Sequence, residues 1–161
     1  MNYSVRNVAL LLSMSLAAAS CTQLPHEQSV SGQKSDVGTV NIYDKQEGRP
    51  CTLKPIAGMD ETYRLGMGKC SSLPNDEAYY FKFDGVPSAV LVTFYDSADC
   101  SKTGNFAFMV RTTQSPTTTT IIKLSAAHAA SEGIIAPGLR LEWKKGDGQV
   151  DGKLSCVRIQ Y

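Results

Sequence analysis

Beyond residue 43, the hydrophobic side chains of this chain alternate with polar ones. In residues 139–144, for example, Leu139, Leu141 and Trp143 face one way while the charged residues between them face the other. A period of two is the repeat of a β-strand with one buried face, and no sustained helical stripe competes with it. The pattern therefore predicts a domain built from strands.

Several other segments have the same strand character. Residues 89–95 form a near-continuous apolar run, which is typical of a central strand buried on both faces. Residues 105–112 alternate and place three large apolar side chains on one face: Phe106, Phe108 and Val110. The remaining predicted strands cover residues 78–83, 117–124 and 154–161, and the alternation over residues 40–42 is compatible with an earlier one.

Turn signals separate these segments and favour antiparallel neighbours. Glycine stands with Asp, Asn or Pro at residues 84–85, 102–105, 137–138, 146–148 and 151–152. Short strands joined by such turns predict an all-β fold, either a single antiparallel sandwich or a small Greek-key barrel. At most one short helix is expected, over residues 125–132, capped by Ser125 and ended by Gly133.

The N-terminus carries a short apolar segment. Arg6 precedes an apolar run over residues 8–16, and small residues follow it. A membrane-spanning helix needs about 20 apolar residues, so this shorter run indicates a signal peptide, here residues 1–20. An A-x-A pattern at residues 17–19 leaves cleavage for ordinary secretion as an alternative.

Cys21 follows directly after Ala18-Ala19-Ser20. This arrangement resembles the signal of bacterial lipoproteins, in which Leu usually stands where this chain has Ala18. The resemblance implies that Cys21 carries diacylglyceryl and amide-linked acyl chains such as palmitate, which together hold a protein stably on a membrane. For an enterobacterial host, Thr22 in the next position implies the outer membrane, facing the periplasm. Lipidation would also account for the odd one of the five cysteines.

The chain is expected to have three parts: the signal peptide at 1–20, the acylated Cys21 with a flexible tether at 21–43, and a disulfide-bonded β domain at 44–161. The tether prediction rests on composition, because this segment is rich in Gln, Ser, Gly and Lys and its apolar residues stand singly. Such a segment buries too little surface to offset its ordering entropy. The C-terminal part is long enough for one domain with its own core.

The other four cysteines are Cys51, Cys70, Cys100 and Cys156. Their even number and the oxidising compartment predict two disulfides, and their spacing does not choose among the three pairings. Structural zinc sites favour close ligand pairs such as C-x-x-C, whereas these cysteines lie far apart and singly. Each disulfide is expected to stabilise the domain by about 2–4 kcal/mol.

Without its signal peptide the chain has no net charge, because the loss of Arg6 leaves fifteen basic and fifteen acidic residues. Nucleic-acid binding requires a basic surface that neutralises phosphates, so no nucleic-acid partner is expected. The sequence also contains no polybasic segment that would bind an anionic membrane. The expected membrane contact is through the acyl chains.

Residues that could carry catalysis are sparse. His26 lies in the tether, and the alanine-rich surroundings of His128 predict a surface residue. Neither a G-x-S-x-G motif nor a glycine-rich phosphate loop accompanies them. Nothing singles out a glycosidase pair among the available carboxylates, which are Asp96, Asp99, Glu132 and Glu142. The prediction is a non-enzymatic protein without a cofactor.

Residues 92–108 contain a strand that ends in aromatic residues, an acidic turn, Gly104 and an alternating aromatic strand. Together with the segment upstream, this pattern resembles half of a Greek-key unit of the βγ-crystallin type, as found in bacterial secreted inhibitors. The resemblance covers residues 74–108 and makes Asp96 and Asp99 calcium candidates. The family's spacing between Tyr and Gly and its calcium signature are not kept, so an ordinary hairpin with a polar turn is the alternative.

A neutral, disulfide-bonded β domain on a lipid tether is suited to presenting a binding surface. Two long connections could do so, at residues 111–120 and 125–138. Tyr and Trp are favoured at interfaces, and the candidate partner-binding residues are Tyr79, Tyr80, Trp143 and Thr118. For the Tyr79-Tyr80-Phe81 segment, a place in a core strand is the alternative.

The predicted function is a protein-binding inhibitor with a toxin or an enzyme as its partner. Its most concrete form is an immunity protein that neutralises a periplasm-delivered toxin, such as a secreted lipase or a cell-wall hydrolase. The alternatives are a structural or assembly lipoprotein of an envelope or secretion machine, a protease or lysozyme inhibitor, and a small-molecule or glycan binder. The last of these would use a pocket around Trp143 and Tyr95.

Overall fold

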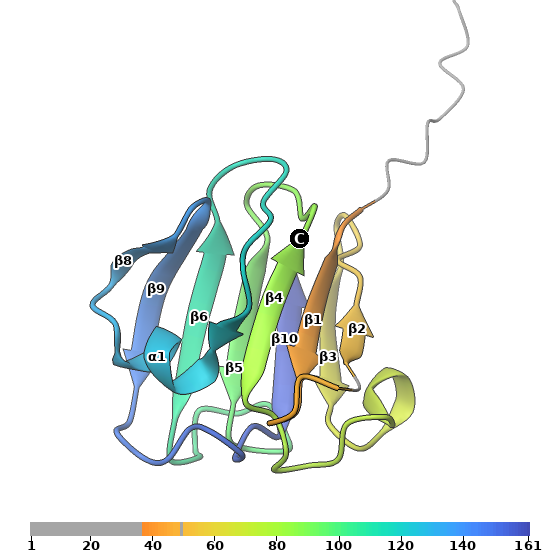
Figure 1. Cartoon of the computed structure of the whole chain (residues 1–161), viewed down its shortest axis with the longest axis vertical. Coiled ribbons are helices and arrows are strands. Elements are labelled where there is room, and N and C mark those ends of the chain that lie inside the picture. The colour runs from red at the N-terminus through yellow and green to blue at the C-terminus, as the bar shows by residue number, and fades with distance from the viewer. Residues whose placement is uncertain (1–36, 49) are drawn as a thin grey trace, which may run out of the picture. The chain divides into compact units, whose positions relative to one another are not determined.

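A computed structural model of the protein describes residues 37–48 and 50–161. The predicted signal peptide, Cys21 and His26 lie outside these residues. The described part is an antiparallel β-sandwich of ten strands with one short helix and one 3₁₀ turn (Figure 1). This confirms the predicted all-β class with at most one short helix. No helix in this part is long and apolar enough to span a membrane.

The ten strands form two sheets, in which all neighbouring strands are antiparallel. The smaller sheet has the order β2-β1-β4-β7, with β1 at Thr39–Tyr43, β2 at Cys51–Leu53, β4 at Tyr80–Asp84 and β7 at Ile122–Lys123. The larger sheet has the order β3-β10-β5-β6-β9-β8, with β3 at Asp60–Arg64, β10 at Cys156–Gln160, β5 at Leu91–Tyr95, β6 at Ala107–Thr112, β9 at Leu139–Lys145 and β8 at Gly133–Ala136. Strand order differs from chain order because the chain crosses repeatedly between the sheets.

The core lies between the two sheets and is centred on aromatic side chains. Phe81 of β4 contacts Phe94 of β5 with ring centroids 4.9 Å apart, and Phe94 stacks on Phe108 of β6 at 4.7 Å. All three are fully buried, and each stabilises the fold by about 1.5–3 kcal/mol. Residues 92–95 of β5 are all buried, which confirms the prediction of a central strand covered on both faces.

The folded domain begins before the predicted boundary at residue 44. β1 lies within the predicted tether, and its Val40 and Ile42 side chains are fully buried. β1 pairs with β2 on one side and with β4 on the other. Two alternating apolar residues are a weak signal in sequence, whereas pairing on both sides makes the segment a central strand. Residues 39–43 therefore belong to the domain.

The strand predicted over residues 117–124 is wrong except at its end, where β7 forms. Thr117 makes only an isolated bridge to Val86, and the Thr119 hydroxyl accepts the backbone N–H of Phe83 at 3.1 Å. A threonine side chain here takes the place of a ladder bond. Because β-branched residues favour strands only where a partner strand is available, propensity alone was misleading.

The single helix, α1 at Leu124–Ala129, is shorter than the one predicted. Its N-cap is Lys123, which makes no side-chain cap bond, so the prediction of Ser125 as the cap is wrong. The helix ends at Ala130 instead of Gly133 because Gly133 begins strand β8. The strands that the sequence did not predict, β2, β3 and β8, are all edge strands.

A β-bulge in β9 turns Trp143 away from the core. Val110 pairs with Leu141 whereas Met109 pairs with Trp143, so Glu142 is an extra residue in β9. Leu141 is fully buried in the core, but Trp143 packs in a separate cluster on the outer face of the larger sheet. The prediction that Trp143 shares the face of Leu141 is therefore wrong, because one inserted residue reverses the alternation beyond it.

Both predicted disulfides are present. Cys51–Cys70 joins β2 to the 3₁₀ turn η1 at Gly68–Cys70, and Cys100–Cys156 joins the turn after β5 to the start of β10. The linked cysteines are 19 and 56 residues apart. Loop-closure entropy then assigns about 3 kcal/mol of stabilisation to the first disulfide and about 4 kcal/mol to the second.

Candidate functional site

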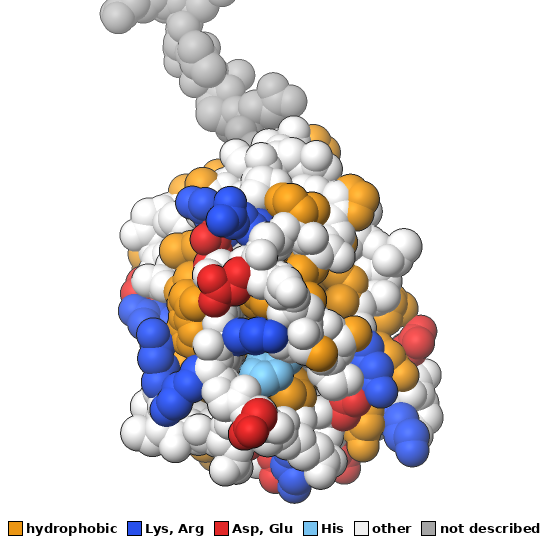
Figure 2. Space-filling model, turned by 90° about the vertical axis from the view of Figure 1, so that its left-hand side faces the viewer, with side chains coloured by type: hydrophobic (Ala, Val, Ile, Leu, Met, Phe, Trp, Pro, Cys, Tyr) orange, Lys and Arg blue, Asp and Glu red, His pale blue; other side chains and the backbone are white. Residues whose placement is uncertain are grey.

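The edge of the sandwich where α1 and β8 meet carries the candidate site. A hollow of about 480 Å³ opens there between the helix and the strand. The residues that line it are mostly small or apolar, and they are Ile122, Ala126, Ala127, Ala130, Ser131, Glu132, Gly133, Ile134 and Ile135. Figure 2 shows this side of the molecule, where several groups of hydrophobic side chains lie among charged and polar ones.

Asp151 holds the N-terminus of α1 in place. Its carboxylate accepts the backbone N–H of Ser125 at 3.1 Å and the Ser125 hydroxyl at 2.8 Å. The same carboxylate pairs with the ammonium of Lys123 at 2.9 Å, and this hydrogen bond raises the pKa of Lys123 above its ordinary value. Because a helix this short is not stable by itself, these contacts fix where it lies.

Lys144 of β9 holds the other end of the helix. Its ammonium donates to the carbonyl oxygens of Ala130 at 2.7 Å and Ala129 at 3.3 Å. The last carbonyls of a helix have no partner within it, and a cation satisfies both their hydrogen-bonding capacity and their partial negative charge. The helix α1 forms one wall of the hollow, and both of its ends are thus attached to β9 or to the connection that follows it.

His128 is buried, contrary to the prediction of a surface residue; its exposed fraction is 8%. The imidazole packs against the rings of Phe106 and Phe108, with centroids 5.9 and 5.7 Å away, and its Nε2 lies 3.2 Å from the Lys145 carbonyl oxygen. The inner face of α1 points at the core, so the alanine-rich context did not mean exposure. Among the described residues, no serine hydroxyl or carboxylate is hydrogen-bonded to His128.

The other wall of the hollow is β8, an edge strand that pairs only with β9. Ile134 in the middle of β8 is 66% exposed, the largest fraction for any large apolar side chain in the described part. Within residues 37–48 and 50–161, residues 133–136 make no backbone hydrogen bond outside the ladder with β9. Edge strands are commonly protected by lysine or proline, and β8 contains neither.

Glu132 supplies an acidic group at the rim of the hollow. Its side chain is exposed, and no ion pair within the described ranges involves it. Glu142 differs, because its carboxylate lies 2.6 Å from Arg111 Nε and 3.7 Å from Arg140 Nε. Glu142 is therefore already paired with arginine side chains, whereas Glu132 is available to a basic group of a partner.

The sequence pointed to this edge only through residues 125–138, which were predicted as a connection that presents a binding surface. The hollow itself had no sequence signal, since it depends on where β8 pairs. Comparison with protein-family models, curated proteins and solved structures finds no match to this chain. The assignment of the site to this edge thus rests on its geometry.

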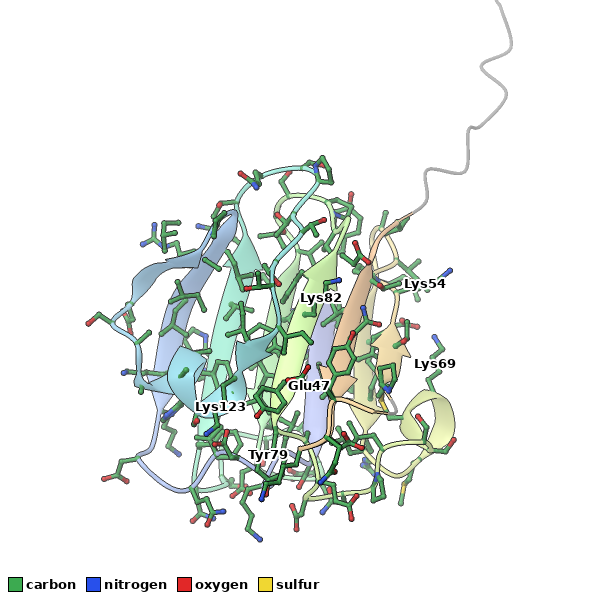
Figure 3. The ribbon with its side chains drawn as sticks, in the orientation of Figure 1. Glu47, Lys54, Lys69, Tyr79, Lys82 and Lys123 are labelled. Carbon is green, nitrogen blue, oxygen red and sulfur yellow. A yellow bond between two sulfur atoms is a disulfide. The ribbon has the colours of Figure 1, made fainter. Side chains whose placement is uncertain are left out.

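The four residues predicted to bind a partner do not form one surface. Tyr79 and Tyr80 lie together at the start of β4, with ring centroids 6.4 Å apart, and both are half-buried. Figure 3 shows Tyr79 close to Lys123, and the Tyr79 carbonyl oxygen accepts the backbone N–H of Leu124 at 2.9 Å. Thr118 lies near the other end of β4, where its hydroxyl accepts the Gly85 N–H at 2.9 Å. The neighbouring Phe81 is a core residue.

Trp143 and Tyr95 are neighbours on the outer face of the larger sheet, packed with the Cys100–Cys156 disulfide. Tyr95 is buried. The ammonium of Lys102 lies 3.9 Å from the centre of the Trp143 ring, a cation–π contact that covers one ring face. A glycan that stacks on Trp143 would have to displace this lysine from that face.

The calcium candidates close the turn between β5 and β6. The Asp96 carboxylate accepts the backbone N–H and the side-chain amide of Asn105, both at 2.8 Å. Asp99 accepts the Ser97 hydroxyl and, at 3.1 Å, the Ser101 N–H; the Ser97 hydrogen bond is the main reason that the pKa of Asp99 is lowered. The part of the chain that the structure describes contains no group of three His, Cys, Asp or Glu side chains placed to hold a metal ion.

A second hollow of about 470 Å³ lies along the opposite edge strand, β3. Its lining is mostly polar: Glu61, Thr62, Tyr63, Arg64, Met67, Gly68 and Lys69. The Tyr63 hydroxyl donates to Glu61, and the Lys69 ammonium lies 5.2 Å from the ring centre. Burial, followed by the hydrogen bond to Glu61, raises the pKa of Tyr63. These internal pairings make the β3 edge less available than the apolar α1–β8 edge.

Proposed function

We propose that this chain is a lipid-anchored envelope protein whose β domain binds and inhibits another protein through the α1–β8 edge. In its most concrete form it is an immunity protein against a periplasm-delivered toxin, such as a secreted lipase or a cell-wall hydrolase. The observation that carries the proposal is the exposed Ile134. It lies beside an apolar hollow on an edge strand that has no outer neighbour among the described residues.

This edge suits an extended segment of a protein partner. The outer backbone groups of β8 can pair with an added strand, and the hollow can take an apolar side chain from it. Glu132 at the rim favours a partner segment that carries Lys or Arg near that apolar residue. Apolar anchors seated in pockets usually supply most of the affinity of such interfaces.

The fixed position of the site supports inhibition more than a transient contact. Asp151 and Lys144 attach the two ends of α1, and Leu124 and Ala127 are buried in the core. A surface that is already ordered loses little conformational entropy on binding, which favours tight capture.

The test is a crosslinked pulldown with the full-length chain from intact cells, followed by mass spectrometry and an activity assay on the captured protein. Ile134→Asp places a charge at the centre of the site, and Met67→Asp is the matched control, since Met67 is 63% exposed elsewhere. We expect one dominant enzyme or toxin that the unmodified chain inhibits. Ile134→Asp should lose capture and inhibition at least tenfold, whereas Met67→Asp should retain both.

Two results would contradict the proposal. The first is recovery of envelope components alone, in equal amounts with all three chains, which would favour a structural subunit. The second is a captured enzyme whose inhibition is unchanged by Ile134→Asp, because the inhibitory surface would then lie elsewhere.

A further inference from the structure

The two ends of the sandwich differ in composition. The strand registers place Thr39 opposite Asp84, and Gln160 opposite both Asp60 and Leu91. We call this end of the sandwich the Val37 end. It consists of these strand ends, the C-terminus and the connections at residues 54–59, 85–90, 113–119 and 137–138. Figure 1 shows the C-terminus at the end where β1 begins.

Charged residues are nearly absent from the connections of the Val37 end. Lys54 is the one charged residue in them. Two acids stand at the strand ends, and each has a basic partner: Asp60 is held by Arg158 through two hydrogen bonds, at 2.7 and 2.5 Å, and Asp84 lies 3.9 Å from the Lys82 ammonium. At the opposite end, the connections at residues 44–48, 65–79, 96–106 and 146–155 each carry at least three charged residues.

The Val37 end also exposes three large apolar or amphipathic side chains. The exposed fractions are 45% for Ile56, 48% for Met59 and 37% for Tyr161. Backbone bonds keep them together: the Met59 N–H donates to the Ile56 carbonyl at 3.0 Å, and the Tyr161 N–H donates to the Met59 carbonyl at 3.0 Å. We call these three residues the Ile56 patch.

We infer that the Val37 end lies against the lipid bilayer, with the Ile56 patch in the headgroup region. This inference rests on the acylation of Cys21 in the proposed function, because residues 22–36 then connect the anchor to this end of the domain. Connections that carry a single charged residue can approach the bilayer while desolvating few ionic groups, and a tyrosine at their edge favours the interface between water and lipid. Lys54 complements anionic headgroups.

This placement gives the domain a fixed orientation. The strands would stand with their Val37 ends at the membrane, and the charged connections would face the aqueous compartment. The α1–β8 edge runs along the side of the sandwich and would stay open to a partner.

The test uses the full-length acylated chain in vesicles of phosphatidylethanolamine and phosphatidylglycerol with brominated acyl chains, which quench an indole that enters the bilayer. Trp143→Phe removes the native indole, Tyr161→Trp places a reporter in the Ile56 patch, and Lys153→Trp places the matched reporter at the opposite end. We expect at least threefold stronger quenching for Tyr161→Trp than for Lys153→Trp. Adding Ile56→Ser and Met59→Ser should remove most of that difference.

Mass spectrometry of the N-terminal peptide and vesicle flotation accompany each sample. Equal quenching of the two reporters in an acylated, vesicle-bound chain would overturn the orientation and leave the lipid anchor intact. The orientation would also be overturned if Ile56→Ser and Met59→Ser changed nothing, or if crosslinking showed the Ile56 patch covered by a second copy. A chain without acyl groups would instead remove the anchor itself, which separates that failure from failure of the docking.

Discussion

The carboxylate of Asp151 accepts hydrogen bonds from both the backbone N–H and the hydroxyl of Ser125, although the two residues are 26 positions apart in the sequence. In most helices a residue just before the first turn performs this capping role, but the N-cap residue Lys123 has no side-chain acceptor. Capping by a distant loop couples the position of α1, and with it the hollow beside β8, to the connection between β9 and β10.

Replacing this cap should loosen the site and lower stability. Asp151→Ala removes the acceptor for Ser125, and a lost cap of this kind reduces the free energy of unfolding by about 1 kcal/mol. Urea unfolding would measure the change, and amide exchange at Ser125 should quicken. Asp147→Ala in the same connection is the control, and equal effects of the two substitutions would contradict the capping role.

The two disulfides should contribute unequally. Replacing Cys100 and Cys156 with serine should reduce the free energy of unfolding by about 4 kcal/mol, against about 3 kcal/mol for the same change at Cys51 and Cys70. The reason is that Cys100–Cys156 closes the longer loop. Denaturant titration of the two double variants would measure this order. Peptide mapping without reduction checks the connectivity, and any other pairing of the four cysteines would refute it.

Lys102 should control access to the Trp143 ring. Lys102→Ala uncovers the ring face that the ammonium now lies over, so iodide should quench the indole more strongly, while stability should change by less than about 1 kcal/mol. Lys153→Ala serves as the control for the change in net charge. Unchanged iodide quenching in Lys102→Ala would mean that the contact does not persist in solution.

Asp60 should stabilise the fold in a pH-dependent way. The hydrogen bond from Arg158 lowers the pKa of Asp60 below its ordinary value of about 3.9. The ionised carboxylate then stabilises the folded state fully above that ordinary pKa, and this contribution is lost as pH falls through the lower folded-state pKa.

Asp60→Asn should therefore lower the urea midpoint at pH 7, and the gap from the unmodified protein should be smaller at about pH 3. Asp147→Asn provides a comparison, because no ion pair of the described residues includes Asp147. A gap of the same size at both pH values would show that the effect of Asp60→Asn does not come from the charge.

The strands that were predicted correctly are those whose burial follows from the pattern of their own residues. In β5 and β6, apolar β-formers are continuous or alternate over five or six residues, so the pattern alone predicts burial. Edge strands lack this information. β2 spans three residues, β3 is mostly polar, and β8 begins with Gly133 and shows no alternation. Their pairing depends on neighbours that are distant in sequence.

Trp143 and His128 show why the surroundings of individual side chains could not be predicted from the sequence. The alternation of β9 predicts an inward Trp143, and the insertion that reverses it is visible only against Met109 and Val110 of β6. The alanine-rich segment predicts an exposed His128, whereas the attachment of α1 through Asp151 and Lys144 turns that side chain toward the core. In both cases the deciding residue lies on another element.

The sequence by itself determined the fold class and the presence of two disulfides. Those properties follow from local alternation, turn chemistry and an even number of cysteines. Only the tertiary structure decided that Cys51 pairs with Cys70, that β8 lies at an open edge, and that a hollow forms between β8 and α1. These features depend on where the segments pack in three dimensions, which is set by the packing of the two sheets around one core.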